Sequence, residues 1–260
     1  MTRISSHHLK RHNESLRRLR KPSLTLSDKD YVIANYNEGV ERVISTKGIF
    51  FTPPELAEAF CIEVTGNRIV DLCAGIGMLS YYYLHHGHHP KVAVNPIDLV
   101  CIERNPDFVK VGEKVLPEAT WICDDITRPG FLESLGLFDM AISNPPFGSI
   151  SHTRGSSFNY SGNHFEYKTI ELASRVARHG TFILPQGSTP FAYSGKRQFE
   201  EQTVSKYTQF KHQTKILIGP SSGIDTSVYQ SQWKFTQVTT EIACCDFTNY
   251  SKPGYQSTLF

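Results

Sequence analysis

The stretch that decides the fold is RIVDLCAGIGM, residues 68–78. Its apolar first half, Arg68–Leu72, predicts a short strand, and the two glycines that follow allow a tight turn with close backbone approach to a ligand. A helix is expected at Met78–His86, stopped by Gly87. The turn lacks the three-glycine spacing of dinucleotide-binding folds and the Gly-Lys-Ser/Thr ending of a phosphate-binding loop, which argues against both.

Strand and helix patterns alternate on the C-terminal side of this unit. Further strands are expected at Asp98–Glu103, Thr120–Cys123, Phe138–Ser143 and 181–185, and helices at 105–115 and 165–179. The apolar runs are continuous, as in parallel strands that helices cover on both faces. The pattern therefore predicts an α/β protein with a doubly wound sheet.

The two flanks have patterns of their own. On the N-terminal side, Ser27-Asp28 is expected to cap a helix that ends near Gly48, and Thr52 to Glu55 resembles a capping box that starts a helix at 53–64. On the C-terminal side, 191–204 could be helical. Two long strands are expected at 207–218 and 232–247, joined by a Gly/Ser-rich loop at 219–227, and they would form an antiparallel pair that completes the sheet.

Composition sets broad limits on the chain. Its 260 residues suit a basic, flexible segment at 1–27 followed by one domain at 28–260. Net charge is only +2, but Met1 to Lys21 holds seven basic residues and one acid, which fits either a phosphate contact or a solvated tail. No apolar run reaches the roughly 20 residues of a membrane span. The six cysteines lack zinc-knuckle spacing, so we expect a cytoplasmic protein with reduced thiols.

Polar residues stand at the ends of four successive strands. They are Asp71, Glu103, Asp124 with its neighbour Asp125, and Asn144. Ligands of open α/β sheets bind at the carboxyl ends of the strands, so these side chains are expected to share one site. A carboxylate at Glu103 can accept both hydroxyls of a ribose, and one of the two aspartates could accept from an adenine amino group, with the other acting as a turn cap.

The strongest signal is Asn144-Pro145-Pro146-Phe147, directly after an apolar strand. The two prolines cannot continue the strand, so they hold a rigid, extended loop. The Asn144 side-chain carbonyl and the Pro145 backbone carbonyl can both accept from one amino group, which favours a pyramidal, nucleophilic nitrogen. Phe147 offers a face on which a planar base can stack. This chemistry requires no metal and no covalent intermediate.

These motifs resemble the class I S-adenosylmethionine-dependent methyltransferases of the Asn-Pro-Pro-aromatic type, and most closely the gamma-type adenine-N6 DNA methyltransferases. The resemblance covers about 48–185 and includes the Thr52 to Glu55 segment that precedes the glycine turn. It implies a Rossmann-like, mostly parallel seven-stranded sheet with an antiparallel C-terminal strand. It also implies methyl transfer to the exocyclic amino group of adenine in DNA, with the flipped base held at Asn144 to Phe147.

The same resemblance assigns roles residue by residue. The residues implied to bind S-adenosyl-L-methionine are Phe51, Thr52, Asp71, Cys73, Ala74, Gly75, Gly77, Glu103, Arg104, Asp124, Asp125 and Asn144. For the substrate, Phe147 is joined by Arg154, Phe158 and Tyr160, which lie in a basic and aromatic segment suited to a splayed-out base. An ordinary surface loop would explain that segment equally well.

Several alternatives stay open at this stage. Only 75 residues follow Pro185, too few for the sheet and a large recognition domain, so a separate specificity subunit or protein partner is possible. The same loop occurs in enzymes that act on RNA adenine or guanine and on protein glutamine. A non-catalytic, methyltransferase-like nucleic-acid-binding subunit is a further alternative. The histidines at 85–89 are interpreted as a surface helix end with no metal, and the Tyr81–Tyr83 run as core packing.

Overall fold

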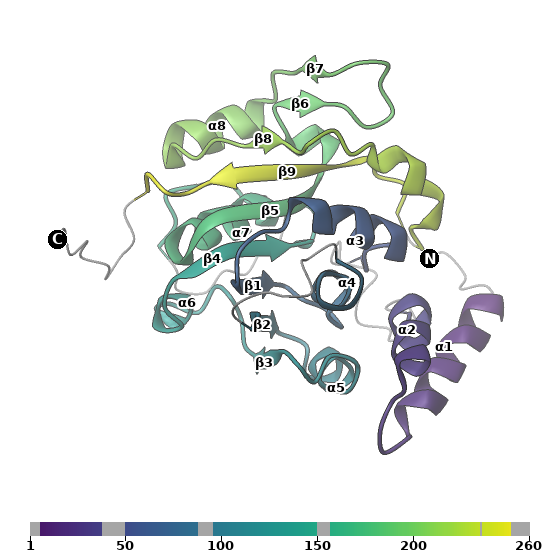
Figure 1. Ribbon diagram of the computed structural model, residues 1–260. Coiled ribbons are helices and arrows are strands. Elements are labelled where there is room, and N and C mark those ends of the chain that lie inside the picture. Colours follow the sequence, from purple (N-terminus) through teal and green to yellow (C-terminus); the bar gives the residue numbers. More distant parts are fainter. Residues whose placement is uncertain (1–5, 38–49, 88–95, 150–156, 235, 251–260) are drawn as a thin grey trace.

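A seven-stranded sheet forms the centre of the computed structural model, which describes residues 6–37, 50–87, 96–149, 157–234 and 236–250. The strand order is β3-β2-β1-β4-β5-β9-β8 (Figure 1). Strands β1 to β5 are parallel, whereas β9 is antiparallel to β5 and to β8. Their bounds are β1 Arg68–Leu72, β2 Asp98–Glu103, β3 Thr120–Cys123, β4 Phe138–Ser143, β5 Ala177–Pro185, β8 Gly219–Pro220 and β9 Thr240–Asp246. The predicted fold class is confirmed, and the bounds of β1 to β4 match the predicted strands.

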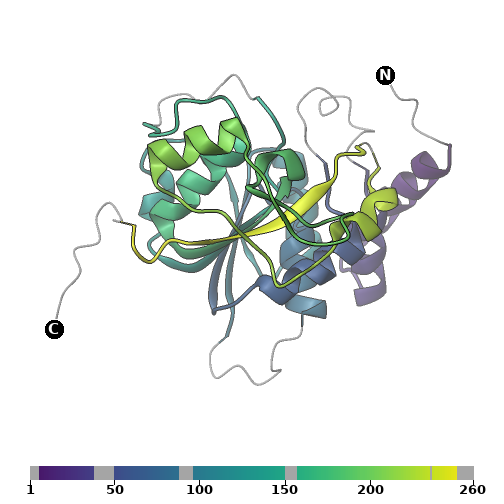
Figure 2. The same cartoon turned by 90° about the horizontal axis from the view of Figure 1, so that it is seen from above.

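Helices cover both faces of this sheet (Figure 2). One layer contains α3 (Pro54–Phe60), its extension η1 (Cys61–Glu63), α4 (Met78–His86) and α5 (Pro106–Val115), and the other contains α6 (Phe131–Ser134), α7 (Phe165–Val176) and α8 (Ser205–Thr214). Neighbouring residues of β1 show why its apolar run is continuous. Ile69 packs in the first layer, whereas Val70 and Leu72 pack in the second.

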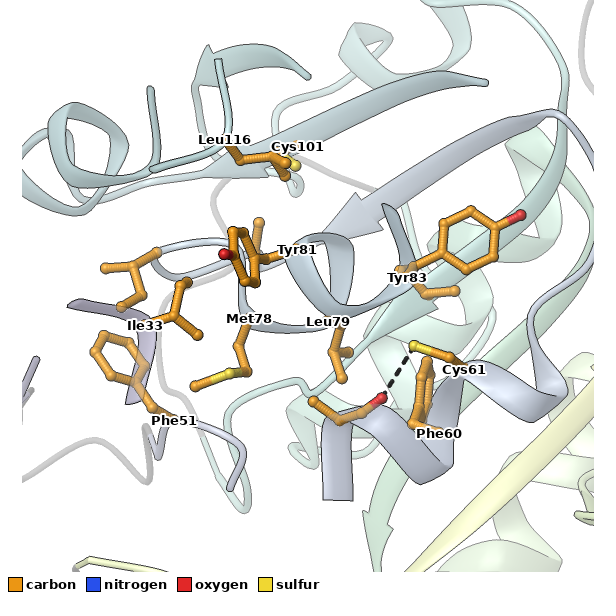
Figure 3. Packing of buried hydrophobic residues seen from close by; sticks show 14 of the residues in the cluster. Ile33, Phe51, Phe60, Cys61, Met78, Leu79, Tyr81, Tyr83, Cys101 and Leu116 are labelled. Atoms are coloured by element: carbon orange, nitrogen blue, oxygen red, sulfur yellow. Dashed lines mark hydrogen bonds between the residues drawn. The ribbon is translucent and has the colours of Figure 1, made fainter. Parts of the chain in front are cut away.

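Helix α4 follows the glycine turn, and buried hydrophobic residues pack around it on several sides (Figure 3). Tyr81 and Tyr83 are both buried, which confirms their predicted packing in the core. The Tyr81 hydroxyl donates to Asp30 Oδ1 at 2.6 Å and so ties α4 to helix α2 (Leu26–Asn35). On the side of α3, the Cys61 thiol donates to the Ala57 carbonyl at 3.1 Å.

The N-terminal region differs in detail from its prediction. A regular helix α1 (Ser6–Leu19) occupies the segment that we expected to be flexible or loosely helical, while the domain division at residue 27 stays a prediction. The predicted cap of α2 at Ser27-Asp28 is wrong. The helix begins at Leu26, because the Thr25 hydroxyl accepts from Asp28 N and the Asp28 carboxylate accepts from Thr25 N. Residues 38–49, where that helix was expected to continue, lie outside the described ranges.

The C-terminal third needs the largest corrections. The predicted strand at 207–218 is mostly helix α8, in which Tyr207 and Phe210 are buried at helical spacing. The predicted helix at 191–204 contains two short paired strands, β6 (Phe191–Ala192) and β7 (Glu200–Glu201). The strand predicted at 232–247 shortens to β9. The loop predicted at 219–227 includes β8 and the start of η3 (Thr226–Gln232). Helix α7 ends at Val176, earlier than predicted, because β5 already begins at Ala177.

Packing of α5 on β3 yields a stability prediction. A Cβ atom added at Gly112 would lie 2.1 Å from the Trp121 ring, which is rigid and donates through Nε1 to the Leu116 carbonyl at 3.1 Å. At an exposed helix position the change from Gly to Ala stabilises by about 1 kcal/mol. Here the clash should dominate, and Gly112→Ala should lower the free energy of unfolding by about 1–3 kcal/mol in urea titrations.

Gly187→Ala is the matched control, because an added Cβ there meets nothing within 4 Å. It should change the free energy of unfolding by less than about 0.5 kcal/mol. A Gly112→Ala protein as stable as the original would contradict this packing.

Candidate functional site

A cavity opens at the carboxyl ends of β1 to β4, where the sequence places its polar residues. It encloses about 930 Å³ of space, its open mouth included. All but Gly77 of the residues predicted to bind a cofactor line it: Phe51, Thr52, Asp71, Cys73, Ala74, Gly75, Glu103, Arg104, Asp124, Asp125 and Asn144. The lining also includes Pro146 and, not foreseen from the sequence, Phe50, Met78, Leu79, Ile102, Ile126 and Phe165. Most of the unforeseen residues adjoin a motif, whereas Phe165 gave no sequence signal.

The glycine turn is held in a left-handed backbone conformation. Gly75 and Gly77 have φ values of 59° and 89°, and Cys73 has a φ of 64°, which is uncommon for a residue with a side chain. A Cβ atom at Gly75 would lie 3.0 Å from the Phe51 ring, so glycine keeps the turn close to the cavity wall. A Cβ atom at Gly77 would meet the Trp121 ring at 3.0 Å, so Gly77 serves the packing of the turn.

Two carboxyl groups brace the turn, one buried and one half-buried. Asp71 is almost fully buried and accepts from the Ser80 hydroxyl through Oδ2 at 2.7 Å, while its Oδ1 has no partner among the described residues. Burial raises the pKa of Asp71 to about 7. Glu103 accepts from the amides of Gly75 at 2.9 Å and Asn105 at 2.7 Å, and burial raises its pKa as well. Each Glu103 oxygen keeps a second lone pair for a ligand.

The aspartates after β3 have different partners. Asp125 Oδ1 accepts from the amide of Thr127 at 2.9 Å and from its hydroxyl at 2.7 Å, which is the turn-capping role expected for one of the pair. Asp124 forms an ion pair with Arg128, whose Nε lies 2.9 Å from Oδ2, and this pairing lowers the pKa of Asp124. The Oδ2 atom of Asp125 lies 3.4 Å from Arg104 Nη1, so Asp125 has a carboxylate oxygen that is less engaged than those of Asp124.

Asn144 is oriented by two acceptors on another segment. Its Nδ2 donates to the Phe50 carbonyl and to the Thr52 hydroxyl, both at 2.9 Å. A carbonyl can only accept, so this pair of bonds fixes which end of the amide is Oδ1. That Oδ1 is buried and has no partner among the described residues. The site therefore contains an aimed, unused acceptor.

The interpretation of Thr52 as a helix cap is consequently wrong. Helix α3 begins at Pro54 with Pro53 as its N-cap, and no side chain caps it. The Thr52 hydroxyl is instead used as an acceptor for Asn144. Proline at the start of the helix lowers the number of free amides that need a cap, which leaves the threonine available.

The loop after Asn144 is held on its other side by residues far along the chain. The Phe147 ring centroid lies 6.0 Å from that of Phe50 and 6.4 Å from that of Trp233. Gly148 donates through its amide to Glu166 Oε2 at 3.1 Å, and the buried Glu166 also accepts from the Ser188 hydroxyl at 2.9 Å. Sequence reasoning missed Glu166 and Trp233, because neither belongs to a motif.

The predicted substrate segment is only partly at the site. Tyr160 is buried in the core, with its ring 5.3 Å from Tyr167 and 5.6 Å from Phe210, which contradicts its predicted contact with substrate. Phe158 lines a different cavity. Its ring centroid lies 5.3 Å from Lys168 Nζ. Arg154 lies outside the described residues.

The histidine cluster does not converge on one point where it is described. His85 Nε2 lies 3.9 Å from Glu118, whereas His86 Nε2 lies 3.3 Å from Asp30. His88 and His89 lie outside the described ranges. Across the part of the chain that the structure describes, no group of three His, Cys, Asp or Glu side chains could hold a metal ion, and no helix is long and apolar enough to cross a bilayer.

The raised pKa of Asp71 leads to a pH-dependent prediction. An unfolded aspartate ionises near pH 3.9, but native Asp71 keeps its proton up to about pH 7. Between these two pH values the native state binds more protons than the unfolded state, so the free energy of unfolding falls as the pH rises. Asp71→Asn removes this effect. Relative to the original protein, the variant should gain up to about 3 kcal/mol between pH 5 and pH 7.

Urea unfolding at the two pH values measures this difference. Asp98→Asn is the control, because that carboxylate is half exposed and pairs with Arg68 on the surface. Its stability relative to the original protein should stay constant over the same range. A constant difference for Asp71→Asn as well would contradict the buried, protonated carboxyl.

Comparisons with known proteins agree with this architecture. No family model matches the chain. The release factor glutamine methyltransferase of Corynebacterium glutamicum is 30% identical over 112 residues, which cover 38% of this chain and 38% of that protein. The chain therefore matches well under half the length of this curated relative.

Three solved structures have a similar fold at low sequence identity. A Listeria monocytogenes protein assigned as a class I S-adenosylmethionine-dependent methyltransferase has a TM-score of 0.57 and 13% identity, covering 91% of this chain and 73% of that one. A modification subunit assigned to a type I restriction enzyme of Vibrio vulnificus has a TM-score of 0.56 and 12% identity, covering 86% and 50%. The type I restriction-modification methyltransferase subunit of Streptococcus thermophilus has a TM-score of 0.53 and 12% identity, covering 84% and 49%. The chain spans about half the length of these two subunits.

Proposed function

Because the chain has the fold of the class I S-adenosylmethionine-dependent methyltransferases, we propose that it transfers a methyl group to the exocyclic amino nitrogen of adenine in DNA. The observation that carries this proposal is the buried, unpartnered Oδ1 of Asn144, whose amide is fixed by Phe50 and Thr52. An unused buried acceptor is costly, so a ligand with an N–H donor is its natural partner.

The cavity residues fit S-adenosylmethionine. Glu103 would accept from the ribose hydroxyls, and Asp125 Oδ2 would accept from the adenine amino group more readily than Asp124, which already pairs with Arg128. The apolar side chains of Ile126 and Phe51 would face the planar parts of the ligand. The unpartnered Oδ1 of Asp71 would accept a further donor of the ligand.

The chain's own residues then act on the target amino group. When bound, the cofactor supplies an electrophilic methyl group on a sulfonium centre. Asn144 Oδ1 and the Pro145 carbonyl accept the two amino hydrogens, which localises the nitrogen lone pair and stabilises the positive charge that grows on it. The cofactor would supply the methyl carbon and leave as a neutral thioether, while Asn144 and Pro145 would hold the amino nitrogen, which would release one proton to water. Phe147 would stack on the base.

Two features favour DNA as the polymer. The Thr52 to Glu55 segment resembles that of gamma-type DNA enzymes, and two proteins with a similar fold are named as subunits of type I restriction-modification systems. Because both proteins are described as subunits, a separate protein subunit is also proposed as a partner of this chain. Sequence readout would then come from that partner, with Phe147 and its loop holding the base.

A second candidate is methylation of a protein glutamine amide. It is favoured by the 30% identity to the release factor glutamine methyltransferase of Corynebacterium glutamicum. The chemistry would be unchanged, since a glutamine side chain also presents a planar amino group to Asn144. The same loop chemistry could also serve an RNA adenine or guanine.

The Asn144→Ala variant tests the chemistry. Removing the oriented acceptor should lower transfer of radiolabelled methyl to DNA by about 10²-fold or more. Isothermal titration should give nearly unchanged affinity for S-adenosylmethionine. Asn67→Ala is the control, because Asn67 lies exposed before the first residue of β1, at the opposite end of that strand from the cavity, and should retain full activity.

Transfer that survives in Asn144→Ala would refute this role for Asn144. Running the assay on DNA, RNA and a release factor separates the candidates, since label in the protein alone would favour the glutamine reaction. An original protein that fails to bind S-adenosylmethionine would support a non-catalytic nucleic-acid-binding subunit instead.

A further inference from the structure

Helix α1 has a basic outer face. From Ser6 to Lys21 the chain contains six lysines and arginines against one acid, Glu14. The opposite side of the helix is packed: His12 and Ser15 are buried, and Leu16 and Leu19 contact the core of the first helix layer. The segment is therefore a docked helix whose charges face solvent.

Part of this charge has no counter-charge. Arg17 and Arg18 pair with Glu14, and Lys21 pairs with Asp28. The remaining three basic residues are exposed and form no ion pair with any residue that the structure describes: Lys10 and Arg11 of α1, and Arg20 directly after its last residue. We refer to these three as the α1 basic face.

Ring contacts connect α1 to the candidate site. The parallel strands point towards the side of the molecule on which α1 and α2 lie (Figure 1). The His12 ring lies 4.8 Å from the Tyr36 ring, and Tyr36 lies 6.4 Å from Phe51, which lines the cavity. Helix α1 is thus two ring contacts away from the cavity wall.

A second connection leads from α1 to the target side of the site. Tyr36, whose ring contacts the His12 ring of α1, also contacts Lys234. Lys234 is held by a bond from its Nζ to the Tyr36 carbonyl at 2.8 Å. It directly follows Trp233, whose ring lies beside Phe147. Positive charge therefore extends from α1 towards the loop that would hold the target base.

We propose that the α1 basic face binds the sugar-phosphate backbone of the nucleic-acid substrate beside the target base. The proposal rests on the nucleic-acid substrate proposed above. Phosphate contacts of this kind set the position of a strand without reading its sequence. A lipid surface fits less well, because a membrane-binding helix needs an exposed apolar face and that face of α1 is packed against the protein.

The test compares two double variants in the full chain. Lys10→Gln/Arg11→Gln removes two charges from the α1 basic face. Arg178→Gln/Lys211→Gln removes one arginine and one lysine that are also exposed, from the start of β5 and from α8. Fluorescence anisotropy with a labelled DNA duplex gives the Kd between 50 and 200 mM salt.

The α1 variant should bind DNA about tenfold more weakly at low salt, and the slope of log Kd against log salt should be shallower by about 1.8, or 0.9 for each lost phosphate contact. The control variant should bind as the original does. Both variants should keep the thermal stability and the S-adenosylmethionine affinity of the original protein, which shows that the change is local.

The proposal would be overturned if the α1 variant had the DNA affinity and salt slope of the original protein. An equal loss of DNA affinity in the control variant would also overturn it. An equal loss of binding to poly-glutamate or to anionic lipid vesicles would also overturn it, since the surface would then not be one for nucleic acid. The outcome is separable from the proposed function. Unchanged binding with normal methyl transfer to DNA refutes only the α1 contact, whereas α1-dependent binding without any methyl transfer refutes only the reaction.

Discussion

The candidate site depends on one constraint, the fixed orientation of the Asn144 amide. Its two donor bonds go to Phe50 and Thr52, more than ninety residues earlier in the chain. Without them the amide could rotate, and its oxygen would have no defined direction. With them, Oδ1 is presented as an acceptor before any substrate arrives, which is the preorganisation that electrostatic catalysis requires.

The rest of the fold can be understood as support for that orientation. The glycine turn is held by Glu103 from β2, and the proline loop by Glu166 from α7. Trp233, from the segment before β9, packs beside Phe147 on the same loop. Elements from every third of the chain therefore meet at one edge of the sheet, so the site forms only when the whole sheet is assembled.

The features that could be predicted from the sequence are those that local interactions determine, whereas features set by contacts between distant residues could not. Strands β1 to β4 and the gathering of Asp71, Glu103 and Asn144 were predictable, because apolar periodicity is local and parallel strands end at a common edge. The role of Thr52 was misread, because the local capping pattern was present but a distant amide uses the hydroxyl. Tyr160 was misplaced for a related reason, since a polar-looking loop sequence does not reveal that its tyrosine packs under α8.

The C-terminal third shows the same limit in the fold. The sequence of α8 predicts a strand, because its few apolar residues fit both the helical and the strand periodicity. The burial of Tyr207 and Phe210 on one face of the helix is seen only in the packed structure. Glu166 could not be assigned a purpose from sequence, because its partners Gly148 and Ser188 lie about twenty residues before and after it in separate segments. Local patterns thus predicted the elements and the place of the site, whereas the contacts that hold the site required the structure.

The proposed reaction places a methyl group on the exocyclic amino nitrogen of adenine. The most direct measurement is mass spectrometry of the nucleosides released from unmethylated DNA after incubation with the purified protein and S-adenosylmethionine that carries a deuterated methyl group. The expected product is N6-methyl-2′-deoxyadenosine that carries the deuterated methyl group. DNA without label, or label on another atom of a base, would contradict the proposed reaction.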